Sequence, residues 1–279
     1  MAPEILDLGP FSIQGYGLLI ALGIVAAWLV VVREARRAGP AQLEGHLPVL
    51  LLTLLAAAFA GGKLAFVLGD PRGAREILER GGVTALAREG FVFYGSLLLC
   101  VPAAVWILRR SHLPVLRGAD VLLLGTSILH ALGRVGCFLS GCCYGSRSDV
   151  PWAVTFRHGH GLNGVPLHPT QLYEAGGELA IFAFLWLCPR RRARFPGQMA
   201  LTYLALYAGL RFLTELLRGD GNPVVLAWTA DGWSPGAPPL GLTLSQLVSL
   251  VVLAVSLPLL ARGLRRGQKG SSPGGGASD

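Results

Sequence analysis

Three long stretches of the chain carry no charged residue, and they constrain the fold more than any other feature. They run from Phe11 to Val32, from Phe91 to Leu108 and from Leu242 to Ala261. Because a helix rises about 1.5 Å per residue, each stretch can cross a hydrocarbon layer roughly 30 Å thick. The chain is 52% hydrophobic and only 14% charged. These features predict a protein that crosses a membrane several times.

Four further apolar stretches are interrupted by a few charges and complete the expected set of spans. They are Leu47 to Leu68, about Val115 to Cys137, Leu172 to Cys188, and Met199 to Leu217. We therefore predict an all-α polytopic membrane protein with about seven transmembrane helices, forming one domain over residues 1–266. Segments 69–90, 138–170 and 218–241 are expected on the outer side, the first as an amphipathic surface piece. The glycine- and serine-rich residues 267–279 are expected to form a disordered cytoplasmic tail.

The basic residues between the spans predict the orientation. They cluster after the first, third, fifth and last spans, at 33–37, 109–117, 190–194 and 262–269. Spans that alternate in direction put these four clusters on one side, which the positive-inside rule makes cytoplasmic. The N-terminus is then outside and the C-terminus cytoplasmic. The net charge of +8 follows from this asymmetry and from contact with anionic headgroups, so it requires no nucleic-acid partner.

Arg134 lies in an otherwise apolar, glycine-rich run from His130 to Gly145. An arginine cannot lose its proton, so at membrane depth it needs a carboxylate, a phosphate, backbone carbonyls or water. The density of glycines in this run predicts that regular helix breaks and exposes backbone amides. A guanidinium with exposed amides is typical of a phosphate site, and the abundant phosphate of a membrane is the phospholipid headgroup.

Two other spans each present a polar face. One carries Tyr207, Arg211, Glu215 and Arg218, and the other carries Gln171, Glu174 and Glu178. The first face has two interpretations: an internal ion pair between Arg211 and Glu215, or a net positive stripe that faces a cavity. We favour the stripe, because ion pairs are costly in lipid. Gln171 and Glu174 are expected either to orient the arginines or to contact a ligand directly.

Three of the five cysteines cluster beside Arg134, at Cys137, Cys142 and Cys143. Three uses stay open: a disulfide from the first to one of the others, a metal site completed by a histidine, or a catalytic thiol. The candidate histidines are His158, His160 and His168. The C-x4-C-C spacing matches no standard zinc pattern, and adjacent cysteines rarely bridge each other. We therefore favour a structural role for these cysteines, and predict no metal and no cofactor.

The order of several short motifs resembles that of the bacterial prolipoprotein diacylglyceryl transferases, over most of the chain. The most specific elements are Gly133-Arg134-x-Gly136, then His168-Pro-Thr-Gln-Leu-Tyr-Glu174, then Arg211-x-x-x-Glu215-x-x-Arg218. Supporting elements are Tyr16-Gly17, Gly61-Gly62-Lys63, Phe93-Tyr94-Gly95, Asp120 and Leu244-Ser-Gln246. Each element alone is weak, and the combination in this order is specific.

The resemblance implies an enzyme of the bacterial cytoplasmic (inner) membrane. It would move the diacylglyceryl group of phosphatidylglycerol to the lipobox cysteine of a prolipoprotein, forming a thioether and releasing glycerol phosphate. Arg134, Arg211 and Arg218 would clamp the phosphate. The other residues expected to bind substrate are Glu215, His168, Gln171 and Glu174.

The chain departs from the family pattern where protons are handled. The histidine that usually opens the third span is replaced by Tyr94-Gly95-Ser96, and cysteines stand where an asparagine and an acidic residue usually follow the Gly-Arg-x-Gly element. We predict Tyr94 and Tyr16 as catalytic residues beside Arg134 and Arg211, with His130 and His168 as other possible bases. Two alternatives stay open: a divergent relative with another thiol acceptor, and a non-catalytic phospholipid-binding or transport protein.

Overall fold

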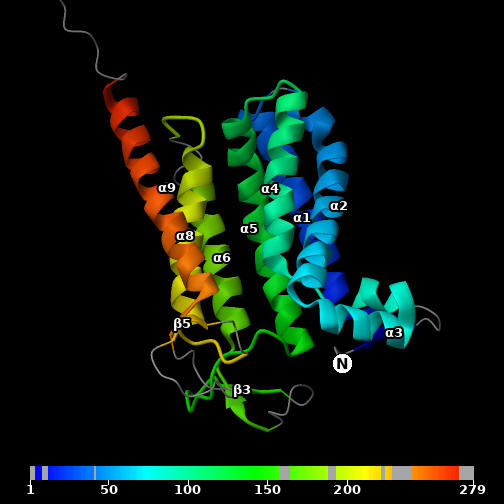
Figure 1. Ribbon diagram of the computed structural model, residues 1–279. Coiled ribbons are helices and arrows are strands. Elements are labelled where there is room, and N and C mark those ends of the chain that lie inside the picture. The colour runs from blue at the N-terminus through cyan, green and yellow to red at the C-terminus, as the bar shows by residue number, and fades with distance from the viewer. Residues whose placement is uncertain are drawn as a thin grey trace, which may run out of the picture. The chain divides into compact units, whose positions relative to one another are not determined.

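The structure is a computed structural model that describes residues 4–7, 12–40, 42–156, 164–187, 193–220, 224–227 and 241–269. Within these ranges the chain forms long helices joined by short segments with a few strands (Figure 1). The helices are α1 Gly15–Ala38, α2 Leu43–Gly69, α3 Pro71–Arg88, α4 Phe93–Arg110, α5 Val115–Ser140, α6 Thr170–Leu187, α8 Gln198–Glu215 and α9 Leu244–Lys269. Each of the seven predicted spans has a helix at its position, and α3 lies within residues 69–90, whose outer-side location stays a prediction.

Five of the described helices are long and apolar enough to cross a membrane: α1, α2, α4, α5 and α9. This confirms a multi-pass helical membrane protein. Helices α6 and α8 have 18 residues each and carry the charged residues that interrupted their apolar patterns. The count of seven spans and the orientation of the ends stay predictions.

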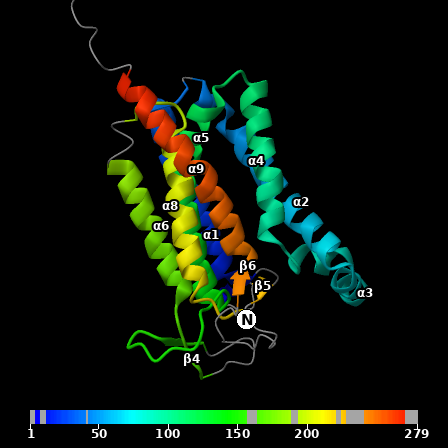
Figure 2. The ribbon, with the colours of Figure 1, turned by 60° about the vertical axis from the view of Figure 1, so that its left-hand side comes forward.

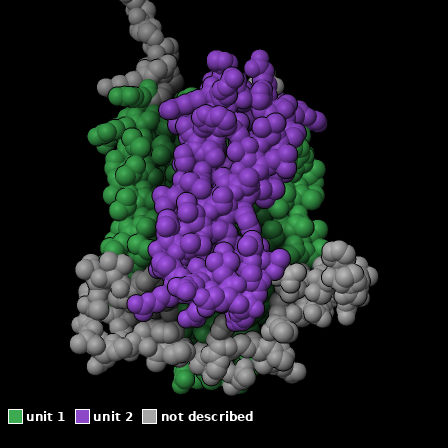
Figure 3. Space-filling view, turned by 45° about the vertical axis from the view of Figure 1, so that its right-hand side comes forward, with its two compact units in different colours: residues 1–33, 119–279 green, residues 34–118 purple. Residues whose placement is uncertain are grey.

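The chain divides into two compact units, shown in different colours in Figure 3. Unit 1 comprises residues 1–33 and 119–279, and unit 2 comprises residues 34–118. In unit 1, α5, α6, α8 and α9 run side by side with the first part of α1 (Figures 1 and 2). Neighbours along the chain run in opposite directions. The last turns of α5 and α8 therefore lie at the same end of unit 1 as the first turns of α6 and α9.

The core of unit 1 joins α5, α6 and α8. Its buried side chains are Leu124, Ile181, Leu185, Met199 and Tyr203. Glycine at position 177 brings α6 close to α8, because a Cβ atom there would lie 2.5 Å from the methyl carbons of Leu210. Apolar packing between these helices places the polar ends of α6 and α8 next to each other.

Regular helix ends within the predicted run, after Ser140, but Gly133 and Gly136 on either side of Arg134 do not break it. The reason is packing against α1. A Cβ atom on Gly136 would lie 3.0 Å from Cδ2 of Tyr16, so the glycine permits close approach of the two helices. The helix ends where Gly141 adopts a φ of +67°, a left-handed conformation that favours glycine.

Three small antiparallel strand pairs belong to unit 1: one precedes α1, one lies between α5 and α6, and one lies between α8 and α9. They pair β1 Glu4–Asp7 with β2 Ser12–Gln14, β3 Val154–Thr155 with β4 Pro166–Leu167, and β5 Val224–Ala227 with β6 Gly241–Thr243. The sequence interpretation did not predict these strands. At the other end of the chain, α9 continues to Lys269, into the range expected for the tail. Residues 270–279 lie outside the described part of the chain.

In unit 2, α2 and α4 approach closely through glycines. A Cβ atom on Gly61 would lie 2.3 Å from the carbonyl oxygen of Gly95, so neither position has room for a side chain. The ammonium group of Lys63 donates to the carbonyl oxygens of Leu86, Glu89 and Gly90 at 2.7, 2.7 and 2.8 Å. The charge within this apolar span is therefore stabilised by the last turn of α3 and the residues after it.

Candidate functional site

Three arginines surround the carboxylate of Glu174, which is 1% exposed in the first turns of α6. Arg134 of α5 pairs through Nε with one carboxylate oxygen, and Arg211 of α8 pairs through Nη1 with the other. Nη1 of Arg218 lies 3.9 Å from the same carboxylate. Thr214 also donates its hydroxyl to Glu174, at 3.2 Å. A single buried carboxylate thus fixes guanidinium groups that come from separate parts of the sequence.

Two more carboxylates complete the ion pairs. Glu215 Oε2 lies 2.6 Å from Nη2 of Arg211, and Asp220 accepts from Nε of Arg218 at 2.8 Å. The internal Arg211–Glu215 pair is therefore present, and the preferred expectation of a net positive stripe on α8 was wrong. The physical reason is that a buried guanidinium group is costly without a counter-ion, and a stripe facing an empty cavity would provide none. Asp220 was not among the predicted site residues.

Arg134 differs from the other two arginines because its terminal nitrogens are left as available hydrogen-bond donors. Among the described residues its ion-pair partner is Glu174, to which Nε is the closest nitrogen, and its terminal nitrogens make no hydrogen bond; its side chain is 15% exposed. By contrast, Arg211 uses both terminal nitrogens, since Nη2 also donates to Ser245 of α9 at 3.1 Å. The terminal nitrogens of Arg134 are thus the guanidinium donors best able to bind an anion.

A second buried carboxylate lies one turn further along α6. Glu178 is fully buried, and its Oε1 lies 2.7 Å from Nδ1 of His130 on α5. The hydroxyl of Tyr203 donates to the same oxygen at 3.3 Å, and the ring of Tyr207 lies 5.0 Å from the ring of His130. Glu178 therefore fixes the ring of His130, one helical turn before Arg134 on α5.

The motif residues around His168 hold the segment that follows α5. Gln171 donates its side-chain nitrogen to the carbonyl oxygen of Cys142 at 2.7 Å, and Thr170 donates its hydroxyl to that of Cys143 at 2.9 Å. The backbone nitrogen of His168 donates to Ser146, and its ring Nδ1 lies 3.2 Å from the hydroxyl of Tyr173. Within the described ranges, these contacts make Gln171 a support for the cysteine segment.

Two glycines let the end of α8 cross this segment. A Cβ atom on Gly145 would lie 2.5 Å from Cβ of His168, and one on Gly219 would lie 2.6 Å from the carbonyl oxygen of Gly145. The backbones of positions 145 and 218 also form an antiparallel bridge. The close contact between the backbone after α8 and the backbone around Gly145 therefore positions Arg218 at the site.

Other motif residues position whole helices. Asp120 at the start of α5 accepts hydrogen bonds from the backbone nitrogens of Gly197 and Ala200, at 2.7 and 2.9 Å, and so caps α8. Thr243 and Gln246 exchange hydrogen bonds between side chain and backbone at the start of α9, which is a capping box. These caps support the helices that carry Arg211 and Ser245.

The two predicted catalytic tyrosines lie in different units. Tyr16 is 42% exposed, and its ring lies against Gly136, half a turn beyond Arg134. Tyr94 lies at the start of α4 in unit 2, with its ring edge-on to Phe93 at 6.3 Å between centroids. Tyr16 therefore packs on the helix that carries Arg134, and Tyr94 is described only within its own unit.

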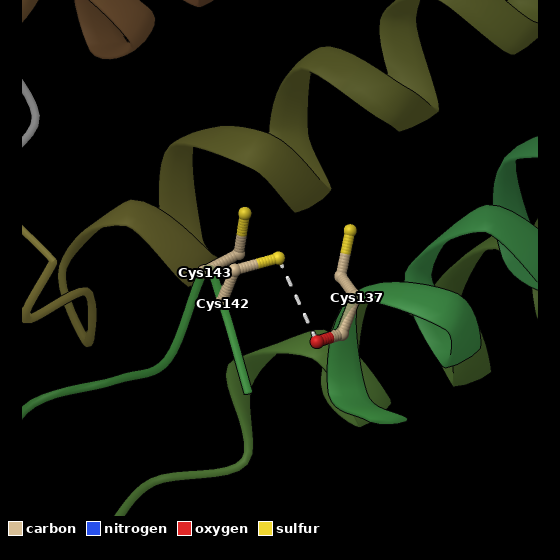
Figure 4. Close-up of side chains that lie close together, drawn as sticks. All are labelled: Cys137, Cys142 and Cys143. Atoms are coloured by element: carbon tan, nitrogen blue, oxygen red, sulfur yellow. Dashed lines mark hydrogen bonds between the residues drawn. The ribbon is translucent and has the colours of Figure 1, made fainter. Parts of the chain in front are cut away.

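The three clustered cysteines are free thiols, so the disulfide considered from the sequence is not present in the structure. Their sulfur atoms all lie within 4.8 Å of one another (Figure 4). Two histidines considered as metal ligands, His158 and His160, lie outside the described residues. The cysteines therefore form a compact group of sulfur donors beside the arginine site.

Helices long enough to cross a membrane, and a buried carboxylate that holds three arginines, define a membrane protein suited to binding an anionic group. The chain matches the prolipoprotein diacylglyceryl transferase family over residues 3–262, and it belongs to that family. The resemblance inferred from its motifs is thereby confirmed.

Curated relatives cover most of the chain. A phosphatidylglycerol–prolipoprotein diacylglyceryl transferase of Roseobacter denitrificans is 31% identical over 94% of this chain and 95% of its own length. Proteins with the same name from Clostridium tetani and Geobacter sulfurreducens are 30% and 33% identical, over 81% and 77% of this chain and 90% and 82% of their own lengths. The similarity therefore includes both compact units.

Proposed function

We propose that this protein transfers the diacylglyceryl group of phosphatidylglycerol to the lipobox cysteine thiol of prolipoproteins. The reaction forms a carbon–sulfur bond, breaks the carbon–oxygen bond to the phosphate and releases glycerol phosphate. The names of the relatives support this donor and this acceptor class. The observation that carries the proposal is Arg134, whose terminal nitrogens take no partner among the described residues beside the buried carboxylate of Glu174.

The arginines act on the leaving group. Negative charge develops on the phosphate oxygen as its bond to carbon breaks, and donors fixed in advance in a region of low dielectric stabilise that charge. Arg134 contacts the phosphate directly, with Arg211 and Arg218 beside it. Glu174 and Glu215 bind substrate indirectly, because they hold the guanidinium groups in place before the lipid arrives.

The acceptor thiol must lose its proton, because a cysteine with a pKa of about 8.5 is mostly protonated at neutral pH. Tyr16 and Tyr94 are the proposed proton acceptors, and each can take the proton only as a phenolate, since the pKa of tyrosine is about 10. Tyr16 packs against α5, the helix that carries Arg134. His130 and His168 are the other possible bases. His168 and Gln171 shape the binding site through the segment that they hold, as their contacts with Ser146 and Cys142 suggest.

The same proposal includes the topology. We infer seven spans within one transferase domain over residues 1–266, with α6 and α8 crossing the bacterial inner membrane among the more apolar helices. With the N-terminus outside and the C-terminus cytoplasmic, the arginine site lies towards the outer leaflet. A prolipoprotein presents its lipobox cysteine there after its signal peptide has entered the membrane.

The test is a reconstituted transfer assay. The purified protein in vesicles that contain labelled phosphatidylglycerol is mixed with a lipobox peptide, and released glycerol phosphate and thioether-linked peptide are both measured. We expect both products from the wild type. Arg134→Gln should lower kcat by about 100-fold, as loss of a donor to a developing oxyanion does.

A matched control is Arg75→Gln, which changes an arginine of α3 that is 81% exposed and paired with Glu79. It should retain the rate of the wild type. If folded wild-type protein gives neither product, the proposed reaction is wrong. If glycerol phosphate is released while the peptide stays unmodified, a different acceptor receives the lipid.

A further inference from the structure

The cluster of Cys137, Cys142 and Cys143 has no role in the transfer scheme above. Each cysteine is partly buried, and the three sulfur atoms lie within 4.8 Å of one another. Figure 4 shows the sulfurs gathered across the turn that follows α5. Among the described residues, no other group of three histidine, cysteine or acidic side chains has this geometry.

The backbone holds the thiols together. Two adjacent cysteines on an extended strand would point to opposite faces, but here Gly141 and Cys143 adopt φ values of +67° and +62°. The backbone nitrogen of Cys142 donates to the carbonyl oxygen of Cys137 at 3.2 Å, which closes the turn. Gln171 and Thr170 of α6 donate to the carbonyl oxygens of Cys142 and Cys143, so the turn is fixed from α6.

We propose that these three thiols form a binding site for a thiophilic d10 cation, either zinc or monovalent copper. Zinc–thiolate bonds of about 2.3 Å in tetrahedral geometry put sulfur atoms roughly 3.7 Å apart. The separations here exceed this by at most about 1 Å, which rotation of the thiol side chains can close. Three soft sulfur donors select such ions over magnesium or calcium.

The guanidinium groups of Arg134 and Arg218 lie near the cluster, so positive charge is in place to offset the negative charge of metal-bound thiolates. Binding of Zn²⁺ by three thiolates releases three protons to solvent and leaves a net charge of −1, which the adjacent guanidinium groups stabilise. The argument for this site does not rest on the proposed transferase activity, although both involve Arg134 and Arg218.

Metal binding by the full-length protein in detergent tests this directly. Protein that has been reduced and stripped with a chelator is titrated in separate arms with Zn²⁺ and with Cu⁺ under anaerobic conditions. We expect one ion per chain, and Co²⁺ should produce thiolate-to-metal charge-transfer absorption. Cys142→Ser and Cys143→Ser should each weaken binding by at least about tenfold.

The matched control is Cys100→Ser in α4, whose thiol donates to the carbonyl oxygen of Leu54. It should bind the metal as the wild type does. If serine variants fail to fold, alkylation of the wild type followed by mass spectrometry decides: bound metal should protect the three clustered thiols and leave Cys100 reactive. Absence of stoichiometric binding, equal loss in the Cys100 variant, or no protection of the cluster overturns the site.

Discussion

Glu174→Gln should destabilise the protein strongly, although the two side chains have nearly the same shape. The glutamine removes the negative charge that Arg134 and Arg211 share, and that Arg218 approaches at 3.9 Å. Because Glu174 is 1% exposed, water cannot replace the lost charge. The substitution therefore tests whether this carboxylate holds the arginines together.

The expected magnitude follows from the remaining pairs. Removing one partner of a buried ion pair costs about 3–5 kcal/mol, because the other charge stays buried without compensation. Arg211 retains Glu215 and Arg218 retains Asp220, whereas Arg134 loses its described carboxylate. We therefore expect the low end of the range, a loss of about 3 kcal/mol in the free energy of unfolding.

Unfolding in detergent micelles, followed by heat or denaturant, measures this loss. Glu79→Gln is the control, since its carboxylate is 64% exposed and its removal should change stability by no more than about 0.5 kcal/mol. A double variant, Glu174→Gln with Arg134→Gln, should lose less than the sum of the two single losses because no unpaired charge remains. A Glu174→Gln protein as stable as the control would refute the shared counter-ion.

Three further substitutions test how the site is positioned. Gly145→Ala should lower both transfer rate and thermal stability, because its Cβ atom would meet the backbone and side chain of His168; activity and melting temperature are measured together. Lys63→Met should destabilise the end of α3 by leaving three carbonyl oxygens without their donor, and hydrogen exchange over residues 83–92 should increase. Thr243→Ala should cost about 1 kcal/mol through loss of the capping box with Gln246, a loss that unfolding would report and that Thr243→Ser should largely avoid.

The helices could be predicted from the sequence because an apolar segment in lipid must satisfy its own backbone hydrogen bonds, which a helix does. All seven apolar stretches coincide with helices, and Arg134, Arg211, Glu174 and the other motif residues of these helices come together as their polar faces required. A charge within an apolar helix must meet another polar group. Such a residue therefore predicts that its neighbours are polar, even where it does not identify them.

Partners that depend on distant parts of the chain could not be predicted. The glycines at 133 and 136 are compatible both with a broken helix and with close packing, and only the position of α1 decides between them. The acceptors for Lys63 are backbone carbonyls, which every sequence offers everywhere. Asp220 follows Arg218 by two residues, and this local spacing was a signal that the sequence interpretation did not use.

The cap that Asp120 makes on α8 has a consequence for genetic experiments. Ala200, which it binds, is eleven residues before Arg211, so the cap lies about 17 Å along the helix axis from that guanidinium. Because α8 is a rigid helix, a shift of its capped first turn along the helix axis would move Arg211 by nearly the same amount. Loss of activity in an Asp120 variant would therefore report a displaced arginine, and a screen for essential residues would include a carboxylate that never meets lipid or peptide.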